Sequence, residues 1–196
     1  MIKIIAGEFK GRLLKTPKNI RPILAQIKKS VFDILTPYLN GCLFLDLYAG
    51  SGAVGIEALS RGAKFCVFVE KERDALQVLS QNVVNLNCQD MCYVIKADIL
   101  KDLFWVEKSR KILYEQFGRK SFDIIFVGAP YVEKDKTHSA NLCVPTLELI
   151  ANSSIIANNG HIVVQHSKRE TVTSDRFKLE RTKHYGDTIV SFFVKN

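Results

Sequence analysis

The chain has 196 residues, which is the size of one domain, or of one domain with a small appendage. Hydrophobic residues make up 47% and charged residues 24% of the sequence, and this excludes a disordered, collagen-like or coiled-coil chain. The longest stretch without Lys, Arg, Asp or Glu, residues 149–167, is too rich in asparagine and serine for a membrane span. The first residues also lack the long apolar segment of a signal peptide.

Positive charge is concentrated near the N-terminus. The first 30 residues hold eight lysines and arginines against a single acid, Glu8, whereas the rest of the chain has 20 bases and 19 acids. A basic segment on a nearly neutral body predicts contact with a polyanion such as nucleic acid; a solvated basic surface is the alternative. We therefore expect a basic N-terminal hairpin or arm over residues 1–22 and a main domain over residues 23–196.

The five cysteines show no disulfide-like pattern. Cys88 and Cys92 are separated by three residues, but no second pair and no nearby histidine would complete a zinc site. We expect no metal. Unpaired cysteines are typical of a reduced compartment, so the sequence predicts a cytoplasmic protein, which we expect to be a monomer that does not bind membranes.

In chain order, turn signals at Gly7 and Gly11 predict a small hairpin, and a helix follows over residues 24–35 that Pro37 ends. Short apolar strands then alternate with helices, which indicates a parallel sheet with helices on both faces. Gly186-Asp187 joins the last two strands as an antiparallel hairpin. The predicted strands are 42–47, 65–69, 93–97, 122–127, 161–165, 177–185 and 188–194, and the predicted helices are 54–60, 72–86, 99–117 and 140–151. The fold class is therefore α/β, with a mostly parallel seven-stranded sheet.

A glycine-rich loop follows the first buried strand and opens a helix. Gly50, Gly52 and Gly55 have the spacing G-x-G-x-x-G in the strand-to-helix context that binds nucleotide cofactors. Glu70 ends the next strand, where a carboxylate can accept both hydroxyls of a ribose. Asp98 ends the strand after that and can meet an adenine amino group. These acids fall at carboxyl ends of strands, where open α/β sheets bind their ligands.

Two types of cofactor share this architecture. A dinucleotide would place its pyrophosphate at the start of the helix. S-adenosylmethionine has no phosphate and carries a sulfonium cation, so the acid Asp46, just before the loop, suits it better. The string Asp-x-Tyr-Ala-Gly-Ser-Gly therefore favours a methyltransferase, and a dinucleotide-dependent oxidoreductase is the weaker alternative.

Two segments carry a resemblance to a known family. They are residues 4–14, Ile-Ile-Ala-Gly-Glu-Phe-Lys-Gly-Arg-Leu-Leu, and residues 45–63, Leu-Asp-Leu-Tyr-Ala-Gly-Ser-Gly-Ala-Val-Gly-Ile-Glu-Ala-Leu-Ser-Arg-Gly-Ala. With Arg21-Pro22, they make the chain resemble the ribosomal RNA small-subunit methyltransferase D family, whose members methylate the exocyclic N2 amine of a guanine in 16S rRNA. The resemblance covers nearly the whole chain. It implies a Rossmann-like class I methyltransferase fold, S-adenosylmethionine as cofactor, and ribosomal RNA in the small subunit as partner.

The resemblance also implies roles for individual residues. The cofactor would be bound by Asp46, Tyr48, Ala49, Gly50, Ser51, Gly52, Gly55, Glu70, Asp98 and Ile99. RNA would be held by Lys10, Arg12, Lys15, Lys18 and Arg21.

The chain departs from the family pattern at two places. The family's catalytic loop reads Asp-Pro-Pro-Tyr or Asp-Pro-Pro-Phe, and this chain has Gly128-Ala129-Pro130-Tyr131 there. Gly128 lacks the carboxylate that accepts a hydrogen bond from the target amine, whereas Tyr131 can still stack on a flipped base. After Arg21-Pro22 the family continues with Thr-Thr/Ser-Asp, and this chain has residues Ile-Leu-Ala-Gln at 23–26. We therefore expect weak activity, and a non-catalytic RNA-binding protein is the alternative.

A second basic stretch lies at residues 168–183, where three acids accompany six lysines and arginines. A solvated strand face is the first interpretation of this stretch, and contact with RNA is the second.

Overall fold

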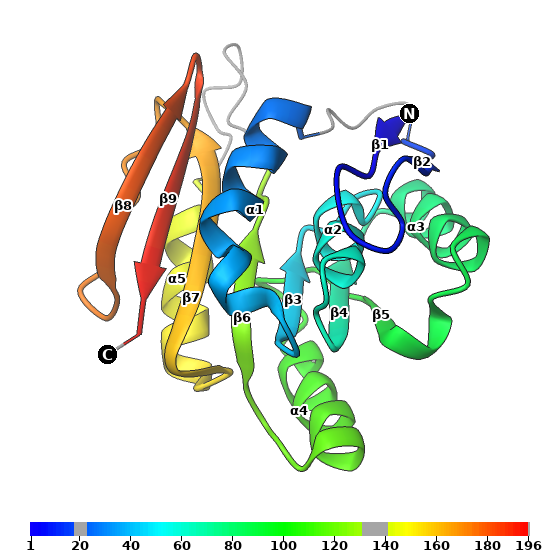
Figure 1. Ribbon diagram of the computed structural model, residues 1–196. Coiled ribbons are helices and arrows are strands. Elements are labelled where there is room, and N and C mark those ends of the chain that lie inside the picture. The colour runs from blue at the N-terminus through cyan, green and yellow to red at the C-terminus, as the bar shows by residue number, and fades with distance from the viewer. Residues whose placement is uncertain (18–22, 131–140, 196) are drawn as a thin grey trace.

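The protein is described here from a computed structural model that covers residues 1–17, 23–130 and 141–195 (Figure 1). In this part of the chain, seven strands form one sheet in the order β5-β4-β3-β6-β7-β9-β8. The first five strands of this order, β5, β4, β3, β6 and β7, run parallel. The last two, β9 and β8, add an antiparallel hairpin at one side of the sheet. The predicted fold class is confirmed. The strands are β3 (Leu43–Leu47), β4 (Phe65–Glu70), β5 (Cys92–Lys96), β6 (Phe122–Val127), β7 (Ile156–Ser167), β8 (Lys178–Tyr185) and β9 (Thr188–Val194).

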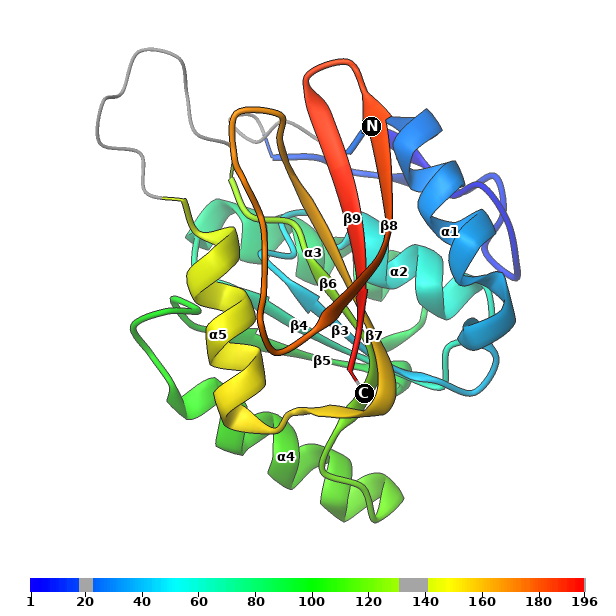
Figure 2. The ribbon, with the colours of Figure 1, turned by 90° about the vertical axis from the view of Figure 1, so that its left-hand side faces the viewer.

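Helices cover both faces of the sheet (Figure 2). One apolar cluster packs α1, α2 and α3 against one face, and another packs α4 and α5 against the opposite face. Successive side chains of β3 alternate between the clusters: Phe44 belongs to the first, and Leu43 and Leu45 to the second. Burial on both faces explains why these strands are continuous apolar runs in the sequence. The helices are α1 (Ala25–Leu39), α2 (Ala53–Ser60), α3 (Arg73–Asn85), α4 (Phe104–Phe117) and α5 (Cys143–Ser153), with a 3-10 turn, η1, at Gln89–Met91.

Some predicted element boundaries are wrong. Helix α1 does not end before Pro37 but continues through it to Leu39. The proline lies in the last turn, where its missing N–H removes only one hydrogen bond near a solvent-exposed end. Helix α4 begins at Phe104 rather than at residue 99, because the chain first forms a turn in which the Asp98 N–H donates to Asp102 Oδ2 (2.8 Å). Strand β7 is longer than predicted and its pairing with β6 shifts register between Phe122 and Ile124.

The N-terminal segment forms a two-stranded hairpin that packs on the main domain. Strands β1 (Ile2–Lys3) and β2 (Leu13–Leu14) pair antiparallel. Ile4, Phe9 and Leu14 are buried in the cluster that contains α1–α3. The basic segment is therefore fixed on the face of the sheet that carries these helices (Figure 1).

Among the described residues, no helix has the length and apolar character needed to span a membrane.

Candidate functional site

The parallel strands bring the predicted site residues to one edge of the sheet, namely the edge formed by the carboxyl ends of the strands. Leu47 at the end of β3 is in register with Val69 of β4 and Val127 of β6. The N–H of Gly128 donates to the carbonyl of Leu47 (3.1 Å), so the loop after β6 begins directly beside the glycine-rich loop after β3. On the other side, the Ala97 N–H donates to the carbonyl of Glu70 (3.0 Å). The ends of β3, β4, β5 and β6 thus form one continuous edge.

The glycine-rich loop turns sharply at this edge. Tyr48, Gly50 and Gly52 all have positive φ, at 60°, 56° and 77°. This conformation is costly for a side chain such as that of Tyr48, whose hydroxyl lies 2.8 Å from the Thr146 hydroxyl on α5. The tyrosine is therefore anchored in its strained position by the opposite helical layer.

Two of the three motif glycines serve close packing. A Cβ at Gly52 would lie 2.3 Å from Leu79 Cδ1 on α3, and a Cβ at Gly55 would lie 2.3 Å from Phe68 Cε1 on β4. These distances are below van der Waals contact, so both glycines let the start of α2 approach the sheet and its neighbouring helix. Gly50 instead donates its N–H to Glu70 Oε2 (2.7 Å).

Asp46 lies beneath the loop and is almost fully buried, with 2% of its surface exposed. Its Oδ2 accepts a hydrogen bond from the Gly55 N–H (2.9 Å). Burial raises the pKa of this carboxyl group to about 8, and the nearby charge of Glu70 adds to the effect, against the lowering by the Gly55 N–H. A buried acid of this kind gains strongly from a cationic group placed next to it, because the cation replaces the lost hydration.

Glu70 fixes the loop to the start of α3. Its Oε1 accepts from the N–H groups of Lys71 (2.7 Å) and Glu72 (2.9 Å), and its Oε2 accepts from Gly50. A carboxylate offers about four acceptor positions, so one stays available on Oε2 for a ligand hydroxyl. Glu70 can therefore accept from one ribose hydroxyl of a nucleoside cofactor, rather than from the two expected from the sequence, and Asp46 fits the cationic part of the cofactor.

Asp98 and Ile99 follow β5 at the same edge. Asp98 Oδ1 accepts from the Leu100 N–H (3.3 Å), and its Oδ2 forms an ion pair with Lys71 Nζ at 3.4 Å. The side chain of Asp98 is 27% exposed, so it is accessible to a ligand. Ile99 is buried in the core between the sheet and α4, and its carbonyl accepts from Trp105 Nε1 (3.0 Å).

The predicted catalytic loop begins at this edge as well. Gly128 is half-buried, Ala129 is buried and Pro130 is exposed, whereas Tyr131 lies outside the described residues. A Cβ at Gly128 would lie 3.0 Å from Phe126 Cε1. A side chain at this position therefore requires only a small shift of one aromatic ring.

The basic residues of the N-terminal hairpin are exposed next to α3. Lys10, Arg12 and Lys15 are at the surface, and Lys18 and Arg21 lie outside the described residues. Arg12 Nη2 donates to the carbonyl of Asn85 (2.8 Å). The Lys15 N–H donates to Asn82 Oδ1 (2.9 Å), while Asn82 Nδ2 donates to the carbonyls of Lys15 and of Ser51, both at 3.0 Å. Asn82 therefore joins the basic hairpin to the glycine-rich loop.

A buried ion-pair network holds the first part of the hairpin. Glu57 of α2 accepts from the N–H groups of Ile5 (2.9 Å) and Ala6 (3.1 Å) and pairs with Lys28 of α1 (2.7 Å) and Arg61 (2.8 Å). The side chains of Lys28 and Glu57 are both 0% exposed.

The sequence did not predict the roles of Glu57 and Asn82. A signal existed for Glu57, since an acid stands alone among the apolar residues that open α2.

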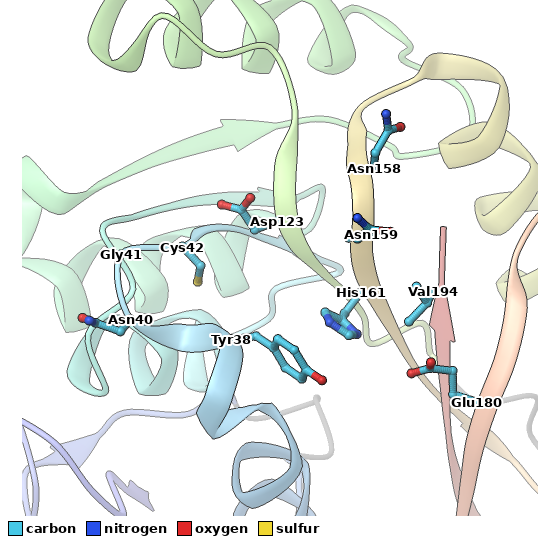
Figure 3. Close-up of a pocket in the computed structure, with 11 residues that line it drawn as sticks. Tyr38, Asn40, Gly41, Cys42, Asp123, Asn158, Asn159, His161, Glu180 and Val194 are labelled. Carbon is cyan, nitrogen blue, oxygen red and sulfur yellow. The ribbon is translucent and has the colours of Figure 1, made fainter. Parts of the chain in front are cut away.

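A hollow of about 570 Å³ lies at the opposite ends of the strands, near the amino ends of β3 and β6 (Figure 3). Tyr38 and His161 line it with their ring centroids 3.9 Å apart, and Asp123 and Glu180 add carboxylates. Asp123 is engaged there by both terminal nitrogens of Arg119 and by the Leu43 N–H. Because it lies at the start of β6, Asp123 is nearly a whole strand away from Gly128 and cannot replace the missing acid of the catalytic loop. No group of three or more His, Cys, Asp or Glu side chains suited to a metal occurs within residues 1–17, 23–130 and 141–195.

Comparison with known proteins identifies relatives over the whole chain. The family model described as Conserved hypothetical protein 95 matches residues 2–194. The Ribosomal RNA small subunit methyltransferase D of Buchnera aphidicola is 32% identical, over 87% of this chain and 81% of the relative. The protein of that name from Haemophilus influenzae is 28% identical, over 97% of this chain and 91% of the relative.

Solved structures show the same fold. The protein yhhF of Escherichia coli superposes with a TM-score of 0.80 at 25% identity, over 100% of this chain and 98% of that one. An RNA methyltransferase from Salinibacter ruber, solved in complex with S-adenosyl-L-homocysteine, has a TM-score of 0.62 at 12% identity, over 89% of this chain and 94% of its own. The family resemblance predicted from residues 4–14 and 45–63 is confirmed. The chain belongs to the Conserved hypothetical protein 95 family, together with relatives named Ribosomal RNA small subunit methyltransferase D.

Proposed function

We propose that this protein is an S-adenosylmethionine-dependent methyltransferase that acts on the N2 amine of a guanine in 16S ribosomal RNA. The observation that carries the proposal is the edge formed by β3, β4 and β6, where Asp46, Glu70 and the loop at Gly128 lie side by side. Relatives named as small-subunit ribosomal RNA methyltransferases support the substrate class. The partner is then the small ribosomal subunit, which a monomeric protein would meet in the cytoplasm.

The residues of the chain divide the work of binding. Asp46 lies where an ionised carboxylate balances the cationic part of the cofactor, and the free acceptor position of Glu70 binds its ribose. Asp98 faces the adenine end, since it follows the next strand along the edge. S-adenosylmethionine, when bound, supplies a methyl group already activated by the adjacent sulfonium. The protein therefore has to orient the acceptor nitrogen and exclude water, rather than to activate a leaving group.

The loop after β6 orients the acceptor. In the family pattern a carboxylate at the position of Gly128 accepts a hydrogen bond from the amine and directs its lone pair. Here only main-chain carbonyls of Gly128 and Ala129 remain for this role. Loss of one well-placed polar group commonly lowers a rate by about 10²–10³, and we therefore propose slow turnover.

Transfer of a tritiated methyl group to 30S subunits from a strain without this modification tests the activity. We expect incorporation at one guanine, at a rate well below that of a relative with Asp-Pro-Pro-Tyr. No incorporation at stoichiometric enzyme would contradict the catalytic proposal.

The substitution pair Gly128→Asp with Ala129→Pro tests the cause of slow turnover. The rate should rise by about 10²-fold or more, since a Cβ at residue 128 only requires Phe126 to move slightly. A matched control, Ala129→Pro alone, should leave the rate unchanged. If the pair gives no gain, the residues at 23–26 or beyond also limit the reaction.

A non-catalytic RNA-binding protein is the second candidate, and the absent acid at Gly128 favours it. This candidate predicts salt-sensitive RNA binding with no methyl transfer. Calorimetry with S-adenosylmethionine and with NAD separates both from an oxidoreductase, which would bind only the dinucleotide.

A further inference from the structure

The outermost strand on the side of the sheet farthest from the N-terminal hairpin carries exposed cations. Strand β8 is the outermost strand, and all its residues from Lys178 to His184 are exposed. Arg181 and Lys183 belong to it, and Arg169 follows the end of β7. None of these three has an ion-pair partner among the described residues, whereas the neighbouring Lys168 is paired with Asp187 at 2.6 Å. We call Arg169, Arg181 and Lys183 the C-terminal basic strip.

The pairing of strands places one end of this strip at the candidate active edge. Ser167, which ends β7, is in register with Thr188 of β9, and Thr188 is in register with Tyr185 of β8. Because β7 runs parallel to β6, the turn between β8 and β9 lies at the same edge as the loop at Gly128. Three strand spacings separate β8 from β6, or about 14 Å. Arg169 lies at this edge, and Lys183 precedes Tyr185 by one pleat repeat, about 7 Å.

The strip and the N-terminal hairpin lie on the same side of the sheet. Arg181 and Lys183 stand opposite Phe192 and Val190 of β9, which pack in the cluster beneath α1. Cross-strand partners share a face, so both cations project toward the side of α1. The hydroxyl of Tyr185 donates to the Ser30 hydroxyl of α1 and confirms this direction. Figure 1 shows α1 between the two basic segments.

We propose that the C-terminal basic strip is a second contact for the RNA backbone, which crosses the active edge between the strip and the N-terminal hairpin. The inference rests on the proposed function for the identity of the RNA. Cations on both flanks neutralise phosphates on both sides of the target base. Glu180, at the bulge of β8, is the acid of the strand, and it lies toward the opposite edge, where it lines the hollow at Tyr38.

Edge protection is the rival explanation for these residues. Lysine and arginine on an outer strand prevent edge-to-edge pairing between copies of a protein. That role requires no RNA, and it predicts self-association when the charges are removed. The two explanations therefore differ in a measurable way.

The test uses the triple variant Arg169→Gln/Arg181→Gln/Lys183→Gln in the full chain. A matched control, Lys108→Gln/Lys111→Gln/Lys120→Gln, removes three exposed charges on or just after α4, near the opposite edge and face. Binding of a short fluorescent single-stranded RNA is measured over a range of salt concentrations. Each lost phosphate contact reduces the slope of log K against log salt by about 0.7, so the strip variant should lose about 2 and the control should lose nothing.

The outcomes are decisive in both directions. An unchanged slope in the strip variant, with or without self-association in light scattering, overturns the proposal. An equal loss in both triple variants also overturns it, because the effect would then come from net charge alone. Methyl transfer by the wild-type protein is scored separately: its absence would remove the proposed function, while a reduced slope would still support the strip as an RNA contact.

Discussion

Replacing Glu57 by glutamine should lower the free energy of unfolding by about 3–5 kcal/mol, the usual cost of breaking a buried ion pair from one side. The Glu57 carboxylate lies 2.7 Å from Lys28 Nζ, and both side chains are fully buried. Among the residues that the structure describes, Lys28 keeps one other hydrogen-bond partner, the carbonyl of Lys3 at 2.9 Å. Glutamine can still accept from the Ile5 N–H, so the loss reports the charges left unpaired on Lys28 and on the largely buried Arg61.

The pH dependence gives an independent readout of the same group. Burial alone would raise the pKa of Glu57, but the hydrogen bonds from Lys28 and from the Ile5 N–H outweigh it and hold the pKa below its usual range. Because the folded-state pKa is lower than the unfolded one, the stabilisation is complete above the unfolded value of about 4.3. It is lost as the pH falls through the folded-state pKa. The Glu57→Gln variant should lack this acid-side loss.

Urea denaturation at neutral pH measures the change, with Asp33→Asn as the matched control. Asp33 pairs with Lys29 at 2.6 Å on the same helix as Lys28, but both side chains are more than half exposed. Its loss should therefore cost well under 1 kcal/mol. If Glu57→Gln costs no more than Asp33→Asn, the reasoning from burial is refuted. The double variant Lys28→Met/Glu57→Gln should recover part of the loss, since it removes the fully buried charge at residue 28 and keeps an amide oxygen that can accept from the Ile5 N–H.

Four further substitutions address the loop and the hairpin. The pKa of Asp46 is raised to about 8, so the fraction of ionised carboxylate grows as the pH rises toward 8. The affinity for S-adenosylmethionine should therefore increase up to tenfold for each unit of rising pH below 8. In calorimetry, the Asp46→Asn variant should bind S-adenosylmethionine weakly at every pH. Gly7→Ala places a Cβ 1.6 Å from the Ser60 carbonyl oxygen, so amide exchange of the hairpin should accelerate strongly. Gly11→Ala, also at positive φ but with open space around it, should cost only about 1–2 kcal/mol. Gly52→Ala should cost more than Gly11→Ala in urea denaturation, because its Cβ meets Leu79 at 2.3 Å.

The sheet was predictable from the sequence because each parallel strand is buried on both faces. Such strands are short apolar runs, as in 43–47 and 122–127, and a polar turn bounds each one. The boundaries of α1 and α4 were not predictable in the same way. Pro37 is tolerated inside α1 since it falls in the last turn, and the start of α4 depends on a turn closed by Asp102. The position of Pro37 in the last turn and the local hydrogen bond of Asp102 are not revealed by periodicity.

The meeting of Asp46, Glu70 and Asp98 at one edge was predictable, because parallel strands end together. The roles of Glu57 and Asn82 were not. Their partners, such as Ile5 and Lys15, are 52 and 67 residues away in the sequence. No pattern in a single sequence encodes such contacts. They appear only when the hairpin is placed against α2 and α3.

The glycine motif itself says less about the ligand than its spacing suggests. Gly52 and Gly55 are required by Leu79 and Phe68, that is, by the packing of α2 against its neighbours. Any protein that starts a helix this close to a parallel sheet needs small residues there, whether it binds a dinucleotide or a sulfonium compound. The discrimination between cofactors therefore depends on the buried carboxyl group of Asp46, which would repel a pyrophosphate when ionised and which attracts a cation. The pH dependence of binding at Asp46 is for this reason a sharper test of cofactor class than any substitution of the glycines.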